Sequence, residues 1–375
     1  MHTLPERKQN KRIFHTIAAL GLIVSLLLLT VSGCAPKGPQ RFRAEWTGSF
    51  DTLIQLIAYT DDEKTFNQFE RQAEERFREL HQLYDRYNSY EGINNIRTIN
   101  EQAGGEPVKV EQEIIDLLII FRDYSLATGR VVDVTLGPLL EIWHDYRTRA
   151  LADPTQAEVP PLNVLQQAAT LRGLEDIEID TDQQTVRLAR AGMSLDVGSV
   201  AKGYATELVA RELEAAGLTS ALISAGGSNV RMIGKPSDSE RPTWNIGLQD
   251  PDSNALVPQT SEVLDTVMVN DTSIVTSGDY QRYYMVDGEL YHHLIDPVTL
   301  MPGNYFRAVS VMLKDSGLAD FLSSTLFLLP LDQGVKMLAQ YPGAEALWIL
   351  PDGTVKATEG MRAVLKDKIA GPIGD

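Results

Sequence analysis

Cysteine and basic residues are both scarce in this sequence. The 375 residues contain one cysteine, Cys34, so no disulfide can form within a single chain. The 34 lysine and arginine residues face 51 aspartate and glutamate residues, which leaves a formal net charge of −17. Proteins that bind nucleic acid need basic surface stripes, so this charge argues against nucleic acid as a partner. The same charge repels phosphates, so a site for an anionic ligand needs local cations or a metal ion.

The N-terminal residues are typical of a targeting segment, which we place at residues 1–33. Basic residues open the segment, and the apolar run Ile17–Leu29 is too short for a comfortable membrane-spanning helix. Val31-Ser32-Gly33-Cys34 resembles a bacterial lipobox, in which the cysteine is lipidated and becomes the new N-terminus. An uncleaved N-terminal anchor is the alternative. Either arrangement predicts a location on the extracytoplasmic face of the bacterial cell membrane, with residues 34–44 as a polar tether.

Hydrophobic periodicity predicts several helices and an N-terminal strand. Apolar residues recur every three or four positions over Glu63–Tyr87, which predicts a long amphipathic helix with one buried face. Phe50–Tyr59 is rich in Ile, Leu and Thr and predicts a strand. Further helices are expected at Glu111–Ala127, Gly137–Arg147, Gly198–Ala216, Leu318–Leu329 and Leu331–Gln340.

Short strands dominate the second half of the chain. Asp287-Gly288 predicts a tight hairpin turn that pairs Val286 with Glu289, and this register sets Arg282 opposite His293. Helices and antiparallel hairpins are segregated rather than alternating, which indicates an α+β fold with mixed or antiparallel sheets. We expect one domain over residues 45–365, followed by a tail at residues 366–375. The other expected strands are Ile177–Asp180, Thr185–Ala189, Ala221–Ala225, Asn229–Ile233, Trp244–Leu248, Val263–Val269, Arg307–Leu313, Ala346–Leu350 and Thr354–Thr358.

Two sequence blocks could hold an anionic ligand. In SLDVGSVAKGYA, residues 194–205, Asp196 and Lys202 flank a predicted helix N-terminus, where unpaired N–H groups favour an anion. In SAGGSNVRMIG, residues 224–234, Gly226 and Gly227 follow a strand and let the backbone approach a ligand closely. An ordinary capped helix with a surface lysine, and a tight turn between strands, are the structural alternatives.

Two further blocks carry groups suited to catalysis and to metal binding. Thr276, Ser277 and His293 lie within residues 275–302, and adjacent histidines on a strand face opposite ways, so His292 and His293 cannot both serve one site. In ADFLSSTL, residues 319–326, Asp320 and Ser324 are four apart on a predicted helix and share a face. An acid and a hydroxyl suit a hard cation such as Mg²⁺. A packed histidine and a capped, buried helix are the alternatives.

These four blocks, in this order, resemble the FAD:protein FMN transferase (ApbE-type) family in its lipoprotein form. FDTLIQLIAY, LYDRYNSYEGINNIRTIN and VVDVTLGPLLEIW add to the resemblance, which spans residues 44–365. It implies an ApbE-like, T-fold-related architecture and Mg²⁺-dependent transfer of FMN from FAD to a threonine or serine hydroxyl, with release of AMP. The implied acceptor is an extracytoplasmic flavoprotein or a subunit of a membrane redox complex.

The resemblance also implies roles for individual residues. His293 matches the histidine proposed to act in the chemistry, and Lys202 contributes charge to it. The carbonyl group of Ser199 and the side chains of Asp320 and Ser324 match the metal site. The residues expected to contact FAD are Tyr87, Val132, Asp133, Asp196, Lys202, Gly226, Gly227, Thr276, Ser277 and Ile295.

The chain departs from the family pattern at three places. Ser324 stands where threonine is common, although a serine hydroxyl can still bind a cation. Leu300 stands where glycine usually follows the Asp-Pro-x-Thr run, and Phe50-Asp51 replaces a frequent Met-Gly pair. Two other functions share the same residues: a pyrophosphatase that splits FAD into FMN and AMP, and a lipoprotein that binds a flavin without reacting. The clustered acid, lysine, histidine and hydroxyl groups favour an enzyme.

Overall fold

The computed structural model describes residues 38–238, 240–253 and 263–374. The predicted targeting segment and Cys34 lie outside these ranges, so the lipidation site stays a prediction. In the described part of the chain, no helix combines the length and the apolar character needed to cross a bilayer.

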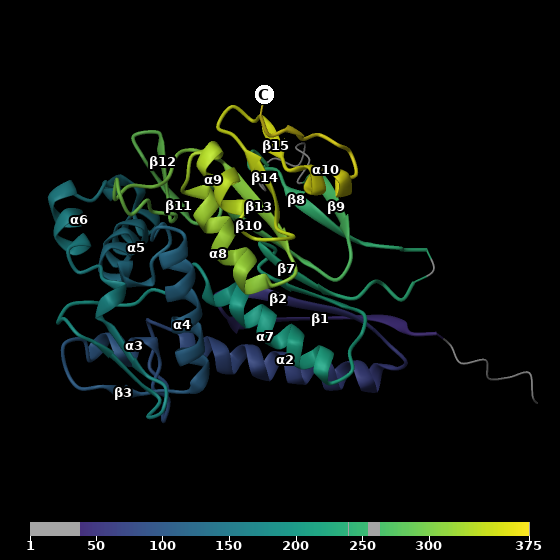
Figure 1. Ribbon diagram of the computed structural model, residues 1–375, viewed down its shortest axis with the longest axis horizontal. Helices are drawn as coiled ribbons and strands as arrows, with labels where there is room; N and C mark the ends of the chain where they lie inside the picture. Colours follow the sequence, from purple (N-terminus) through teal and green to yellow (C-terminus); the bar gives the residue numbers. More distant parts are fainter. Residues whose placement is uncertain (1–37, 239, 254–262, 375) are drawn as a thin grey trace, which may run out of the picture.

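A nine-stranded sheet forms the centre of the molecule (Figure 1). Its order is β1-β2-β6-β7-β10-β13-β14-β15-β16, and every neighbouring pair is antiparallel except β15 and β16. The α+β fold with mixed sheets is therefore confirmed. The strands are β1 (Gln40–Ser49), β2 (Thr52–Thr60), β6 (Ala221–Ala225), β7 (Asn229–Ile233), β10 (Ser273–Gly278), β13 (Ala308–Leu313), β14 (Glu345–Ile349), β15 (Val355–Ala357) and β16 (Gly371–Pro372).

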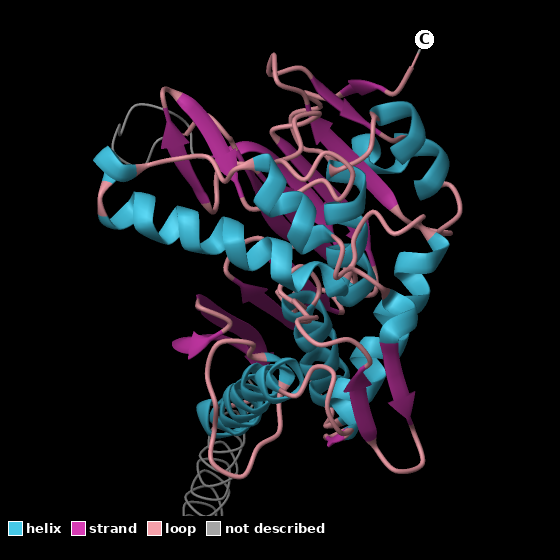
Figure 2. Ribbon diagram, turned by 90° about the vertical axis from the view of Figure 1, so that its left-hand side faces the viewer, coloured by secondary structure: helices cyan, strands magenta, loops and turns pink. Residues whose placement is uncertain are grey.

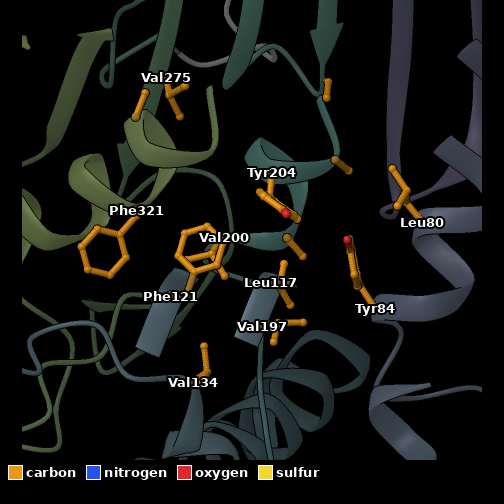
Figure 3. Close-up of a cluster of buried hydrophobic side chains, with 14 of the residues drawn as sticks. Leu80, Tyr84, Leu117, Phe121, Val134, Val197, Val200, Tyr204, Val275 and Phe321 are labelled. Carbon is orange, nitrogen blue, oxygen red and sulfur yellow. The ribbon is translucent and has the colours of Figure 1, made fainter. Parts of the chain in front are cut away.

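Helices cover one face of this sheet (Figure 2). They are α2 (Glu63–Tyr84), α7 (Ala201–Ala215) and α8 (Ser316–Phe327), with α4 (Gln112–Ala127) packed against α2. The Phe121 ring of α4 lies 5.8 Å from the Tyr204 ring of α7 and 6.0 Å from the Phe321 ring of α8 (Figure 3). This apolar cluster holds α4, α7 and α8 together. The start of α7 and the middle of α8 carry predicted site residues, so the cluster sets their positions relative to each other.

A second layer closes the other face of the sheet. The ribbon of β8 (Trp244–Gln249) and β9 (Val263–Val269) buries Trp244, Ile246 and Val267 against apolar side chains of the sheet and of α10 (Glu359–Val364). The alternation of buried and exposed residues along β8 is the period-two pattern of a strand with one buried face.

A smaller unit stands beside the sheet, where α5 (Gly137–Ala152) and α6 (Leu162–Ala169) pack near the predicted hairpin. The hairpin consists of β11 (Tyr283–Val286) and β12 (Glu289–His292), and Val286 pairs with Glu289 as the turn predicted. The Tyr291 ring stacks on Trp143 of α5 at 6.1 Å. The remaining elements are α3 (Ile96–Glu101), β3 (Val108–Lys109), β4 (Ile177–Asp180), β5 (Thr185–Leu188) and α9 (Leu331–Leu338).

Several boundaries differ from the sequence prediction, and three of them affect the extent of the domain or the position of a site residue. Residues 40–44, expected in the tether, form the first half of β1 and pair with β2. The tail at residues 366–375 also belongs to the fold, since Gly371–Pro372 add a strand to the sheet edge. Helix α2 ends at Tyr84 because the Asp85 carboxylate accepts hydrogen bonds from the N–H groups of Tyr87 and Asn88 and forms a turn. Tyr87 therefore lies on a loop.

Candidate active site

One cavity of about 520 Å³ collects most of the predicted site residues. Its walls come from α5, the end of α2, the start of α7, α8, β10 and the base of the β11–β12 hairpin. This volume is in the range of pockets that hold small ligands and cofactors. The predicted residues that line it are Tyr87, Asp196, Ser199, Lys202, Gly226, Thr276, Ser277, His293, Asp320 and Ser324.

Residues 195–200, directly before α7, place apolar side chains in the core and polar side chains in the cavity wall. Leu195, Val197 and Val200 are buried in the core, and this turns Asp196 and Ser199 toward the cavity. The Asp196 carboxylate accepts a hydrogen bond from the Gly198 N–H group at 2.8 Å and so closes the turn before the helix.

Asp196 also has an ionic partner that the sequence did not reveal. Its Oδ2 atom lies 2.6 Å from Nη1 of Arg86, whose side chain is 8% exposed. The two residues are 110 positions apart, so no local pattern could indicate the pair. The negative charge that Asp196 brings to the cavity is therefore balanced by the positive charge of Arg86.

Lys202 and Asp320 bring opposite charges to the inner end of the cavity. Burial lowers the pKa of the Lys202 ammonium and raises that of the Asp320 carboxyl, while each group partly offsets the shift of the other. Lys202 donates from Nζ to the Ser228 hydroxyl at 2.6 Å, and Asp320 Oδ2 accepts from the Gly203 N–H group at 2.8 Å.

Gly203 permits the close approach of α7 and α8 that positions Asp320. A Cβ atom at Gly203 would lie 2.3 Å from Cβ of Asp320 and 2.7 Å from the Ser316 carbonyl oxygen. Any larger residue would therefore separate the helices. Gly226 has a comparable constraint, with a φ of 68° and a virtual Cβ atom 2.3 Å from Oγ1 of Thr52, so this glycine serves packing against β2.

Three serine hydroxyl groups form a cluster beside Asp320, on α8 and the neighbouring strand β10. Ser277 Oγ lies 3.1 Å from Ser324 Oγ and 2.9 Å from Ser323 Oγ, and Ser323 donates to the Asp320 carbonyl oxygen. Thr276 Oγ1 lies 2.7 Å from Ser310 Oγ at the neighbouring strand position.

These oxygen donors fit a hard cation. The described residues contain no cluster of three or more His, Cys, Asp and Glu side chains, so they lack the ligand set of a structural zinc site. In that same part of the chain the Oδ1 atom of Asp320 has no hydrogen-bond donor. One carboxylate with hydroxyl and carbonyl groups is a suitable partial ligand set for Mg²⁺, which usually retains waters and phosphate oxygens as its other ligands.

The two histidines differ as the alternation predicted. The His292 Nε2 atom donates to the Gly303 carbonyl oxygen at 2.7 Å, and Nδ1 accepts from the Leu294 N–H group at 3.1 Å, so this residue is structural. His293 lines the cavity, and its buried Nδ1 atom has no partner in the described chain. Burial and the nearby Arg282 charge lower the pKa of His293 to about 3, so its imidazole is neutral near pH 7.

Four predicted contacts are not brought to the cavity. Val132 packs in the main core, and Ile295 packs in the smaller apolar cluster between α5, α6 and the β11–β12 hairpin. The Asp133 carboxylate is buried and caps Thr135, and it forms an ion pair with Arg172 at 2.7 Å. Gly227 is not among the residues that line the cavity.

Sequence reasoning missed most of the wall that α5 contributes. Leu140, Trp143, His144 and Arg147 recur every three or four residues and face the cavity together. The His144 ring packs against the Tyr87 ring at 5.1 Å with a tilt of 31°, and Tyr87 also lines the cavity. The helical spacing was visible in the sequence, but nothing local distinguished this face from an ordinary core face.

Comparison with known proteins places this geometry in context. The model of the ApbE family matches residues 50–348. The FAD:protein FMN transferase of Treponema pallidum (strain Nichols) is 32% identical over 278 residues, which cover 71% of this chain and 73% of that protein. A protein with the same description from Klebsiella pneumoniae (strain 342) is 28% identical over 277 residues, or 72% of this chain and 80% of the relative.

Solved structures show the same fold. The ApbE protein of Thermotoga maritima superimposes with a TM-score of 0.73 at 24% identity, covering 87% of this chain and 99% of the other. The Pseudomonas stutzeri flavinyl transferase ApbE gives a TM-score of 0.70 at 22% identity, covering 88% and 98%.

Proposed function

The chain belongs to the ApbE family and has FAD:protein FMN transferase function, and from this premise we propose that the cavity transfers FMN from FAD to a threonine or serine hydroxyl with the assistance of Mg²⁺. The single observation that supports this assignment most strongly is the convergence of Lys202, His293 and Asp320 on one cavity. These groups come from three separate elements, yet together they supply a cation, a proton acceptor and a metal ligand.

Each end of the cavity has a distinct task in this proposal. The Asp320 carboxylate, the Ser324 hydroxyl and the Ser199 carbonyl group would hold Mg²⁺, and Ser277 keeps the Ser324 hydroxyl oriented. When bound, Mg²⁺ supplies positive charge to the diphosphate of FAD. Lys202 adds charge at the same end and so opposes the repulsion of the acidic protein surface.

His293 is positioned to accept the proton of the acceptor hydroxyl. Its neutral form has a free lone pair, although a pKa of about 3 makes it a weak base in the empty cavity. An anionic diphosphate beside the ring stabilises the imidazolium and raises this pKa, because an opposite charge favours the charged form. Proton acceptance is therefore coupled to substrate binding.

The test is an assay of covalent flavin on an acceptor. The protein is incubated with FAD, Mg²⁺ and co-expressed extracytoplasmic proteins, and mass spectrometry is used to find a mass gain equal to bound FMN. His293→Ala at saturating FAD should lose most of the transfer, and Asp320→Ala should lose the Mg²⁺-dependent rate. Release of free FMN and AMP without a labelled acceptor would show a pyrophosphatase instead.

Lipid attachment at Cys34 is also part of the proposal, supported by the lipobox-like residues 31–34. The protein would then act at the outer face of the cell membrane on acceptors that share this compartment. Cys34→Ala should move the protein from the membrane fraction to the soluble fraction and prevent labelling with a radioactive fatty acid. Unchanged labelling of this variant would refute the anchor.

A further inference from the structure

Two arginines in the cavity wall form no ion pair in the part of the chain that the structure describes. Arg147 lies on α5, and Arg282 directly precedes β11. Within residues 38–238, 240–253 and 263–374, neither guanidinium forms an ion pair, and Arg147 donates only to Nδ1 of His144, at 3.0 Å. Arg86 differs, because it pairs with both Asp196 and Glu141. Arg147 and Arg282 thus form no direct ion pair among these residues, and the charges of Asp196 and Asp320 act on them only at longer range.

The fold holds these two arginines on joined elements. The paired register ends at Tyr283 and His292, so Arg282 and His293 flank the end of the hairpin, and both line the cavity. The stacking of Tyr291 on Trp143 fastens the hairpin to α5 one turn before Arg147. Both arginines are therefore presented to the cavity by packed elements rather than by a free loop.

Their charges oppose each other and the neighbouring imidazole. Burial and the Arg282 charge lower the pKa of Arg147, and both arginines contribute to the low pKa of His293. Although the chain has a net charge of −17, the two guanidinium groups repel each other at this place. An anion that enters between them removes this repulsion. The arrangement is therefore a preformed anion site.

We propose that Arg147 and Arg282 bind the phosphate group of FAD that carries riboflavin, which is the phosphate transferred to the acceptor. This inference rests on the proposed function. Arg147 is connected through His144 to Tyr87, the expected flavin contact, so the pair lies at the flavin side of the diphosphate. The charges of both arginines also act on Tyr87, where they oppose the rise of its pKa. Arg282 acts on Lys202 and Asp320 as well, so it lies between Tyr87 and these two residues, which we assign to the phosphate that leaves with AMP.

Arg282 also takes part in the chemical step. The acceptor oxygen forms a bond to the phosphorus that carries riboflavin, and the bond from this phosphorus to the bridging oxygen breaks. AMP leaves with that oxygen and both bonding electrons, and the acceptor proton passes to His293. The Arg282 guanidinium donates to the non-bridging oxygens of the transferred phosphoryl group, where its planar fork matches two oxygens at once.

Binding of separate halves of FAD tests the assignment without an acceptor protein. Calorimetry in the presence of Mg²⁺ compares FMN, riboflavin and AMP on wild type, Arg147→Gln and Arg282→Gln. Loss of a charge-assisted hydrogen bond should lower the preference for FMN over riboflavin by about tenfold or more in each variant, with AMP affinity unchanged. Arg149→Gln is the matched control, because Arg149 lies on the same helix but packs 4.2 Å over the Tyr146 ring, outside the cavity.

A second variant separates catalysis from binding. Arg282→Lys keeps the charge but loses the fork, so its transfer rate at saturating FAD should fall by about 10²-fold while its FMN affinity changes little. An unchanged preference for FMN over riboflavin in both glutamine variants overturns this inference, as does an equal loss of AMP affinity. A wild-type protein that binds no flavin at all refutes the proposed function itself.

Discussion

Leu300 adopts a left-handed backbone conformation, with a φ of 64°, at the position where the family usually has glycine. The Phe50-Asp51 turn is similar, with φ values of 55° and 51°, and it connects β1 and β2 in the manner of a tight hairpin. Both departures have local compensation. His81 accepts from the Phe50 N–H group at 3.2 Å, and the Leu300 carbonyl accepts from Nε1 of Trp143 at 3.1 Å.

Leu300 allows packing and backbone strain to be measured separately. Its side chain is only 7% exposed, so Leu300→Ala should remove packing while retaining the strain, at a cost of roughly 2–3 kcal/mol. Leu300→Gly removes the same packing but relieves about 1 kcal/mol of strain. The glycine variant should therefore be the more stable of the two in urea unfolding, the reverse of the usual order. The opposite order would show that Leu300 carries no backbone strain.

Gly203 is the residue on which the metal ligand depends most directly. Gly203→Ala places a methyl group 2.3 Å from Cβ of Asp320, so the helices must separate by about 1 Å to restore ordinary carbon contacts of about 3.5 Å. We expect the free energy of unfolding to fall by about 1–3 kcal/mol. We also expect the Mg²⁺-dependent rate to be lost. Gly334→Ala, on α9, is the control, because a Cβ atom there would have no neighbour closer than 3.4 Å. A fully active Gly203→Ala protein would contradict the placement of Asp320.

At the scale of elements, the β11–β12 hairpin is held by a neutral histidine. Burial lowers the pKa of His292 to about 4, and protonation would place a hydrogen on Nδ1, where the ring now accepts from Leu294. A folded-state pKa below the unfolded value of about 6.5 stabilises the protein above pH 6.5, and this stability is lost as the pH falls toward 4.

The contribution of His292 to the pH dependence can be isolated. It amounts to on the order of 3 kcal/mol between pH 6.5 and pH 4. His292→Gln retains a donor and an acceptor but cannot be protonated, so its urea stability should fall less over this range than that of wild type. His293→Gln serves as the comparison, because His293 has its own low pKa of about 3. Equal slopes for His292→Gln and wild type would show that folding does not lower the pKa of His292.

Local patterns predicted the elements better than the site. The helix predicted over residues 63–87, which ends at Tyr84, the Asp287-Gly288 hairpin and most strands follow from periodicity and turn residues. Strand β1 was missed because its first residues were assigned to the polar tether, although Phe42, Ala44 and Trp46 alternate with exposed charged residues. Strand β10 is not among the predicted strands, because its Thr-Ser-Gly end is typical of a turn and its residues are buried on both faces, so they show no alternation.

At the scale of the whole molecule, the cavity depends on contacts that no short window contains. The pairs Arg86–Asp196 and Trp143–Leu300 join segments more than 100 residues apart. The blocks indicated which groups take part, but their partners arise only when the sheet, α5 and the hairpin are assembled. For the same reason Asp133 and Val132 were expected at the cavity, although the fold uses them for a cap and for the core.

The C-terminal tail is the clearest case of a segment that the sequence marked as peripheral. Asp265 is 1% exposed, and its carboxylate accepts from the N–H groups of Asp367 at 2.9 Å and Ile369 at 3.4 Å. Removal of residues 366–375 leaves this buried charge with fewer donors and also removes β16 from the sheet edge. We expect a loss of roughly 3 kcal/mol or more in the free energy of unfolding.

A second substitution identifies the cause of this loss. In the truncated chain, Asp265→Asn should recover part of the stability, since an unpaired amide is less costly to bury than an unpaired carboxylate. The same substitution in the full chain should destabilise, because the N–H groups of Asp367 and Ile369 then lose a charged acceptor. Removal of Gly374 and Asp375 alone, which leaves β16 in place, is the control for shortening. Opposite signs of the Asp265→Asn effect in the two chains would establish that the tail belongs to the folded domain, and equal effects would show that it does not.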